Sequence, residues 1–201
     1  MNQVPRGRAQ LLLLALLFFG PMLAASLLYF VFPQWQPQGR VNYGELIHPA
    51  RPLPALQLLD AQGRVLDTQQ AFGGRWTWLY LGAAQCERAC LDKLYQIRQV
   101  RALLNEKRQR AQRVYLAPDA GSLAALRERL AAEHPDLKLY AEQGAAQLPA
   151  FLAQDAGKAA GAQTLYLIDP HGNWLMVYPD AADSTGLLKD IKKLLSLSQI
   201  G

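Results

Sequence analysis

The feature that most constrains this chain is an uncharged apolar run near its N-terminus. Residues 11–32 read LLLLALLFFGPMLAASLLYFVF, and none of these twenty-two residues carries a charge. As a helix that rises 1.5 Å per residue the run is about 33 Å long, enough to cross a hydrocarbon core of about 30 Å. Gly20-Pro21 lies within it, and a proline kink is tolerated inside a membrane. The run predicts a transmembrane anchor.

The charges that flank this run predict its orientation. Arg6 and Arg8 precede it and no acidic residue does, so the positive-inside rule places residues 1–10 in the cytoplasm and the rest outside. A cleaved signal peptide is the alternative, but that needs a shorter apolar core and a small-x-small cleavage site. The following PQWQPQGR has no such site, so a retained anchor is favoured. In either case the body of the protein faces an oxidising compartment.

The composition excludes several classes of protein. Hydrophobic residues make up 51% of the 201 residues and charged residues 18%, which argues against disorder. The 21 basic and 16 acidic residues leave a net charge of +5 with no dense basic stripe, so nucleic acid is not an expected partner. Two cysteines are too few for a disulfide scaffold or a four-thiolate zinc site.

The remaining sequence predicts a stalk followed by one domain. Prolines and glycines recur through residues 33–52, which indicates an irregular stalk. From residue 53 to 199, strand and helix patterns alternate and end in two strands and a helix, so we expect an α/β mixed sheet with helices on both faces, as in a thioredoxin-like fold. The expected strands are 56–59, 65–66, 75–82, 113–117, 137–140, 164–169 and 174–178, and the expected helices are 87–109, 121–133, 145–154 and 185–197.

The two cysteines, Cys86 and Cys90, lie where the strand 75–82 passes into the first long helix. A helix N-terminus offers unpaired N–H groups and the positive end of the helix dipole, and both favour a thiolate at Cys86. Arg88 adds a positive charge nearby. The spacing C-x-x-x-C places both sulfurs on one helix face, where they can clamp Cu(I) or form a disulfide. A disulfide requires the first turn to loosen at Cys86, because the Cβ atoms of such a pair are about 5–6 Å apart in a regular helix.

Three uses of this pair remain open. It can carry redox or metal chemistry, form a purely structural disulfide, or simply fill a core with two small apolar side chains. A structural disulfide across so short a loop would stabilise the fold little. Chemistry is favoured because these are the only cysteines of an exported chain and they lie at a strand-to-helix turn.

Several motifs occur in an order that resembles one known family. Residues 53–63 read L-P-x-L-x-L-x-D-x-x-G, F-G-G-R-W-T follows at 72–77, then the C-x-x-x-C, and Y-L-I-D-P-x-G lies at 166–172. Over about residues 50–197 the chain resembles the Sco/SenC proteins, membrane-anchored thioredoxin-like factors of cytochrome c oxidase assembly. The resemblance implies a single-pass protein of the inner (cell) membrane with a periplasmic domain.

The resemblance also implies a site. Proteins of this family bind copper with the two motif cysteines and a distal histidine, and they deliver copper to, or reduce the thiols of, the copper centre in oxidase subunit II. Cys86 and Cys90 match those cysteines. The stretch that matches the histidine, residues 158–164, contains none, and Glu87-Arg88 stands where the family usually has Pro-Asp. These departures put copper binding in doubt and leave dithiol chemistry intact.

Other residues offer little chemistry. His48, in the expected stalk, could fold back over the cysteines as a substitute ligand. His134 is expected in solvent at the end of a helix, His171 in a surface turn, and Met176 in the core. A solvated helix face is expected for three acidic residues, Glu128, Glu133 and Asp136.

Three functions follow from these observations. The first is a thiol-disulfide reductase of a copper-site partner, such as oxidase subunit II, with Cys86 as the attacking thiolate and Cys90 as the resolving one. The second is a metallochaperone that holds Cu(I) between Cys86 and Cys90 with a weak or external third ligand. The third is an assembly scaffold in which the thiols have no role.

Overall fold

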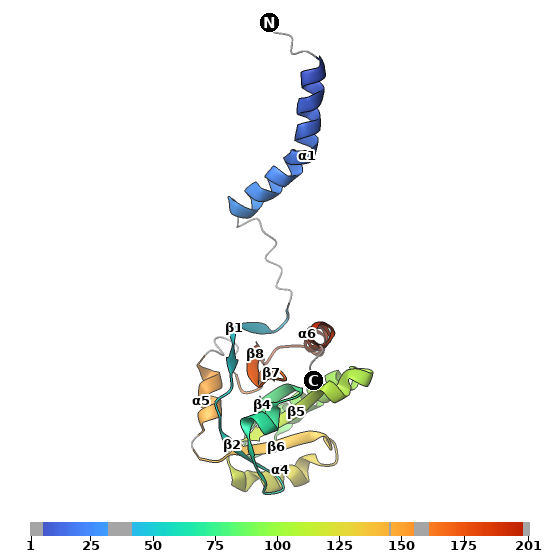
Figure 1. Ribbon diagram of the computed structural model, residues 1–201. Coiled ribbons are helices and arrows are strands. Elements are labelled where there is room, and N and C mark those ends of the chain that lie inside the picture. The colour runs from blue at the N-terminus through green and yellow to red at the C-terminus, as the bar shows by residue number, and fades with distance from the viewer. Residues whose placement is uncertain (1–5, 32–41, 145, 155–160, 199–201) are drawn as a thin grey trace. The chain divides into compact units, whose positions relative to one another are not determined.

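The computed structural model describes residues 6–31, 42–144, 146–154 and 161–198. It divides into two units, residues 1–41 and 42–201. The first unit contains helix α1, Arg6–Phe30, which includes Pro21 and changes direction partway along (Figure 1). Its segment Gly7–Phe30 is long and apolar enough to cross a membrane, and none of it is buried. The predicted apolar anchor is therefore one continuous helix up to Phe30.

The second unit is built on one eight-stranded mixed sheet (Figure 1). Its strand order is β1-β8-β7-β4-β5-β6-β2-β3. The neighbours β4, β5 and β6 run parallel, and every other pairing is antiparallel. The strands are β1 Glu45–Pro52, β2 Gln57–Asp60, β3 Val65–Asp67, β4 Trp76–Leu81, β5 Ala111–Ala117, β6 Leu137–Glu142, β7 Leu165–Ile168 and β8 Asn173–Tyr178.

Helices pack against both faces of this sheet, as the alternation of strands and helices predicted. One face carries α3, α4 and α6, and the other carries α2 and α5. The central strand β4 is therefore buried on both sides: Trp78 and Tyr80 contact the first group of helices, and Leu79 lies in the second core. This explains why β4 reads as an almost continuous apolar run. The helices are α2 Thr68–Phe72, α3 Arg88–Ala102, α4 Leu123–Leu130, α5 Gln147–Ala153 and α6 Ser184–Leu197.

Residues 45–52, which were expected to be irregular, form the edge strand β1. This strand pairs antiparallel with β8, and its register shifts between Leu46 and Arg51. Pro49 and Pro52 are compatible with such a strand because an edge strand has one side without a ladder. Just before β1, the backbone N–H groups of Tyr43 and Gly44 donate to the buried carboxylate of Asp190 in α6, at 2.9 and 2.8 Å. The domain therefore begins before residue 53.

The first long helix is shorter than the predicted 87–109. Helix α3 ends at Ala102, and a 3₁₀ helix, Asn105–Arg110, leads into β5. Asn105 has a φ of 51°, a left-handed conformation that asparagine tolerates better than most residues. The helix has to end here because β5 runs parallel to β4 and its first residue, Ala111, pairs with the first residue of β4, Trp76.

The prediction that His134 lies in solvent is wrong, because this residue is buried against Arg113. Asp136 pairs with the same arginine but is exposed, as expected. Arg113, which is fully buried in β5, donates to both carboxylate oxygens of Asp136 and to the carbonyl oxygen of Leu94. A guanidinium can only donate, so the 3.3 Å contact of Arg113 Nη1 with His134 Nδ1 makes that nitrogen an acceptor and His134 neutral. Burial, followed by the nearby Arg113 charge, lowers the pKa of His134. His134 is only 2% exposed because it covers this arginine.

Candidate functional site

The candidate site lies at the edge of the sheet where the parallel strands β4, β5 and β6 end. The chain leaves β4 through Gly82, whose Cα faces the ring of Tyr115 in β5. A Cβ atom at Gly82 would lie 1.8 Å from that ring, so only glycine fits. The Tyr115 hydroxyl group donates to the carbonyl oxygen of Ala83 at 2.5 Å. Strand β5 thus fixes the start of the loop that carries the first cysteine.

Cys86 and Cys90 are joined by a disulfide, with their Cα atoms 5.3 Å apart. Helix α3 begins at Arg88 with Glu87 as its N-cap residue. Cys86 therefore lies outside the helix and Cys90 in its first turn, which is the loosening that a disulfide at this spacing requires. Both side chains are buried, at 7% and 6% exposure, against the core on the α3 side of the sheet.

The electrostatic environment of Cys86 comes mainly from the helix. Glu87 makes no side-chain cap hydrogen bond, so the first N–H groups of α3 are not capped by a side chain. These groups and the helix dipole favour a thiolate at Cys86 after reduction. Arg88 contributes less than expected, because its guanidinium is exposed and bonds Asp92 one turn along the helix. An exposed pair of this kind interacts weakly.

A cleft of about 270 Å³ opens beside Cys86. The cysteine loop forms one wall, and Ala125, Leu126 and Arg129 of α4 form the other. Cys86 lines this cleft and Cys90 does not. A partner in the cleft would therefore reach Cys86 first. Ala125 and Arg129 could not be predicted from the sequence, because nothing in the local sequence brings α4 beside residue 86.

Three polar side chains, Tyr80, Tyr115 and Lys93, belong to the core that holds the cysteines or to the next turn of α3, and each is neutral or already hydrogen-bonded. The Tyr80 hydroxyl group donates to Gln163 Oε1 at 2.9 Å, and its ring lies 5.4 Å from that of Tyr115. Burial raises the pKa of both phenols, so they stay protonated. Lys93, one turn after Cys90, donates from Nζ to the carbonyl oxygen of Asp180, and burial lowers its pKa. None of the three is a carboxylate or imidazole base for a thiol.

The segment before β7 reaches the same edge of the sheet. Tyr80 pairs with Leu165, so residues 161–164 leave the sheet where residues 82–86 do. The resemblance to Sco/SenC proteins aligns this stretch with the one that carries their histidine. Here the backbone N–H group of Gln163 and the hydroxyl group of Thr164 donate to the carboxylate of Asp180. Residues 158–160 of the matching stretch lie outside the described residues.

The three histidines lie elsewhere. His48 is an exposed residue of β1, His171 is in the turn between β7 and β8 as expected, and His134 covers Arg113. Among the residues that the structure describes, no group of three or more histidine, cysteine, aspartate or glutamate side chains is placed to hold a metal ion. The described donor set near the disulfide is therefore the two cysteine sulfurs. Met176 lies in the core, as expected.

This geometry defines a class of protein: a thioredoxin-like domain with a cysteine pair at the amino end of its first long helix. The domain follows an N-terminal helix that is long and apolar enough to cross a membrane. Sequence comparison agrees. Residues 76–198 match the family described as "Transmembrane-like, thioredoxin-like, C-terminal domain", and residues 2–31 match its companion, "Transmembrane-like, N-terminal domain". The chain belongs to this family, and the two matches support single-pass membrane anchoring. No curated protein matches the chain in a sequence search.

Solved structures with the same fold include Sco proteins from several organisms. Arabidopsis thaliana ScoI with copper bound is 18% identical, with a TM-score of 0.57, over 73% of this chain and 99% of that one. Yeast Sco1 with copper bound is 17% identical, with a TM-score of 0.59, over 74% of this chain and 90% of the yeast chain. Apo Sco1 from Thermus thermophilus is 19% identical, with a TM-score of 0.59, over 76% of this chain and 96% of the Thermus chain. The resemblance to Sco/SenC proteins is thus confirmed for the fold.

Proposed function

We propose that this chain is a membrane-anchored thiol-disulfide reductase that acts on a copper-site protein during cytochrome c oxidase biogenesis. The observation that carries the proposal is the disulfide between Cys86 and Cys90, which the domain holds at the amino end of α3 with Cys86 beside an open cleft. The likeness in fold to copper-bound Sco proteins supports a role in cytochrome c oxidase biogenesis. Oxidase subunit II is the proposed partner.

The reaction needs only the two cysteines of this chain. In the reduced protein the Cys86 thiolate attacks one sulfur of a partner disulfide, forms a mixed disulfide and releases the other partner sulfur, which takes a proton from water. The Cys90 thiolate then attacks Cys86 Sγ, which closes the disulfide of this chain and releases the second partner thiol. Two electrons pass to the partner. A dithiol reductant of the same compartment then reduces the pair again.

The location of this reaction follows from the anchor. We propose that residues 1–10 lie in the cytoplasm and that the domain lies in the periplasm, attached to the inner membrane by α1. Arg8 and Arg6 on one side of the span and no acidic residue before it support this orientation.

A Cu(I) carrier is the second candidate, because Sco structures with this fold contain copper. Cu(I) is a soft ion, for which thiolates are suitable ligands. Cys86 and Cys90 would hold the ion as cargo after reduction of their disulfide, and the partner would supply any further ligand. A scaffold role, in which the cysteines have no part, is the third.

A trapping experiment tests the reductase proposal. The full-length chain carrying Cys90→Ser is reduced and mixed with oxidised oxidase subunit II. Without the resolving thiol, a mixed disulfide through Cys86 should accumulate and dissolve on addition of a small-molecule thiol. The matched variant Cys86→Ser should trap far less. Absence of the adduct, or equal trapping by both variants, would refute the assigned roles.

A copper titration separates the alternatives. The reduced wild-type chain and the Cys86→Ser/Cys90→Ser variant are titrated with Cu(I) against a chromophoric chelator. Tight one-to-one binding that requires both cysteines would support the carrier. Binding no tighter than that of the double variant would exclude it, and the trapping result would then decide between a reductase and a scaffold.

A further inference from the structure

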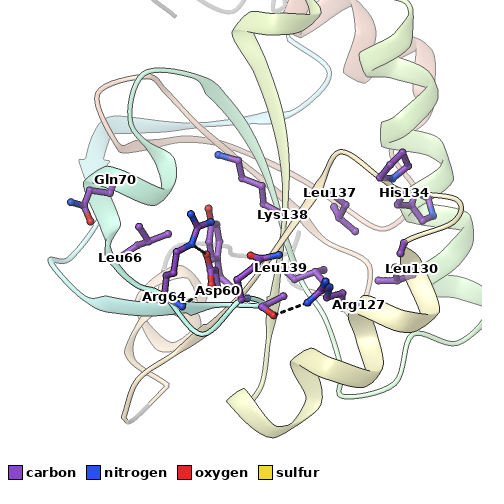
Figure 2. Close-up of a pocket in the computed structure, with 15 residues that line it drawn as sticks. Asp60, Arg64, Leu66, Gln70, Arg127, Leu130, His134, Leu137, Lys138 and Leu139 are labelled. Atoms are coloured by element: carbon purple, nitrogen blue, oxygen red, sulfur yellow. Dashed lines mark hydrogen bonds and ion pairs between the residues drawn. The ribbon is translucent and has the colours of Figure 1, made fainter.

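A pocket of about 520 Å³ opens where the sheet lacks part of a strand (Figure 2). Strand β2 pairs with β6 from Leu58–Glu142 to Asp60–Tyr140 and then turns away, whereas β6 begins three residues earlier, at Leu137. No described strand pairs with residues 137–139 on this side. The turn after β2 and helix α4 enclose the resulting notch. It lies along the first residues of β6, whereas the cysteines follow the far end of the parallel strands.

The charged groups that line the pocket are mostly cationic. Arg64, Arg127 and Lys138 line it, and the only lining carboxylate is that of Asp60. Asp60 is already compensated: it accepts from Arg64 Nε at 2.7 Å and from the backbone N–H groups of Gln62 and Arg64. Figure 2 shows Arg127 reaching from α4 toward the turn after β2. An anion in the pocket would therefore meet a net positive field.

Three lining groups have no hydrogen-bond partner among the described residues: the Lys138 ammonium, the Tyr140 hydroxyl group and the buried Nε2 atom of His134. The half-buried Lys138 makes no ion pair or hydrogen bond with the described residues, and burial together with the Arg75 charge lowers its pKa. Tyr140, two residues further on the same face of β6, is only 5% exposed, and its hydroxyl group makes no hydrogen bond within the described chain. Burial raises the pKa of Tyr140, so the group remains a donor. An ammonium and a phenol that both lack acceptors suit an anionic ligand.

The rest of the lining is apolar. Leucine side chains contribute from three elements, and they are Leu66, Leu130, Leu137 and Leu139. The volume falls in the range of small-molecule sites, which combine apolar walls with a few polar groups. We propose that this pocket binds a small organic acid, in which a carboxylate or phosphate is carried on an apolar body. Lys138, Arg64 and Tyr140 would receive the anion, and the leucines would contact the apolar body.

Calorimetric titration of the full-length chain in lipid nanodiscs tests this site, with empty nanodiscs subtracted. The probes are 4-phenylbutyrate, phenyl phosphate and the neutral isostere 4-phenylbutyramide. One of the two acids should bind one-to-one with a Kd below about 1 mM, and the amide should bind at least about tenfold more weakly. The acid that binds more tightly identifies the anion. Failure of both acids to saturate, or equal binding of the amide, would overturn the proposal.

Three variants locate the binding. Lys138→Gln should weaken the acid about tenfold, because it removes a charge-assisted hydrogen bond. Ala131→Trp, at an exposed position that lines the pocket, should block binding sterically while leaving the fold intact. Lys193→Gln changes an exposed lysine of α6 outside the pocket and should leave the Kd unchanged. If both the Lys138 and the Ala131 variants bind the acid as tightly as the wild type does, the ligand lies elsewhere and the proposal is wrong.

Discussion

The hydroxyl group of Tyr115 donates to the carbonyl oxygen of Ala83 at 2.5 Å, and the ring of the same tyrosine leaves no room for a side chain at residue 82. A residue of the neighbouring strand thus holds the loop that carries Cys86. The loop is positioned by the core of the domain rather than by its own sequence.

Gly82→Ala should destabilise the domain by about 1–3 kcal/mol, because the new methyl group would overlap the Tyr115 ring. Tyr115→Phe keeps the ring and loses only the hydrogen bond, so it should cost about 1 kcal/mol. Urea unfolding followed by tryptophan fluorescence measures both. Equal unfolding midpoints for wild type and Gly82→Ala would mean that the ring can move away.

Removal of the disulfide should leave the domain folded. The bond between Cys86 and Cys90 closes a loop of only a few residues, so the Cys86→Ser/Cys90→Ser variant should lose no more than about 2 kcal/mol of unfolding free energy. The reduced wild type provides the matched comparison. Loss of the folded circular-dichroism signal in either form would show that the disulfide is structural.

The stability of the domain should fall as the pH drops below about 6.5. His134 has a lowered pKa in the folded state, so between that value and about 6.5 the unfolded chain binds an extra proton. Unfolding free energy should therefore decrease by up to about 1.4 kcal/mol for each pH unit. Urea unfolding at pH 7.5, 6.5 and 5.5 measures this slope. His134→Gln should flatten it, whereas His171→Gln, in the exposed turn, should retain it.

The cleft beside Cys86 should control access of the partner. Ala125→Trp, at an exposed position of α4, would fill the cleft and slow mixed-disulfide formation with a protein partner more than with a small disulfide. Ala124→Trp is the matched control, since Ala124 is also exposed and does not line the cleft. Rates from quenched-flow trapping should differ between these variants by at least about tenfold, which corresponds to a rise of about 1.4 kcal/mol in the activation free energy. Equal rates would mean that the partner approaches from another side.

The orientation of the anchor is open to a direct test. External protease added to spheroplasts should digest the domain, because the arginines before the span predict a cytoplasmic N-terminus. A tag fused to the C-terminus reports the cleavage, and a cytoplasmic marker protein serves as the control. A tag that the protease cuts only after the cells are lysed would contradict the proposed topology.

The parts of the fold that were predicted correctly depend on neighbouring residues. Strand β4 is apolar on both faces, and α3 shows regular three- and four-residue steps, so both are evident locally. The C-x-x-x-C pair is also visible in the local sequence, and its two cysteines form a disulfide in the structure, whereas its chemical role stays a prediction. The end of α3 was missed because it depends on Asn105 adopting a positive φ, which the helical period does not indicate.

The parts that were missed depend on distant residues. His134 is buried by Arg113, 21 residues earlier in the chain, and nothing near His134 indicates this. Strand β1 is stabilised by β8, more than 120 residues later, and its prolines argue locally against a strand. Arg129 reaches the cysteine cleft only through the packing of α4. Such contacts require the completed fold.

The attachment of Tyr43 and Gly44 to Asp190 determines where the chain can be cut to obtain a soluble fragment. A fragment that begins at residue 53, the boundary expected from sequence, would remove β1 and leave β8 as an open sheet edge, which favours aggregation. It would also leave the buried Asp190 carboxylate without the two N–H donors that compensate it. Solution measurements on this protein should therefore use fragments that begin before Tyr43.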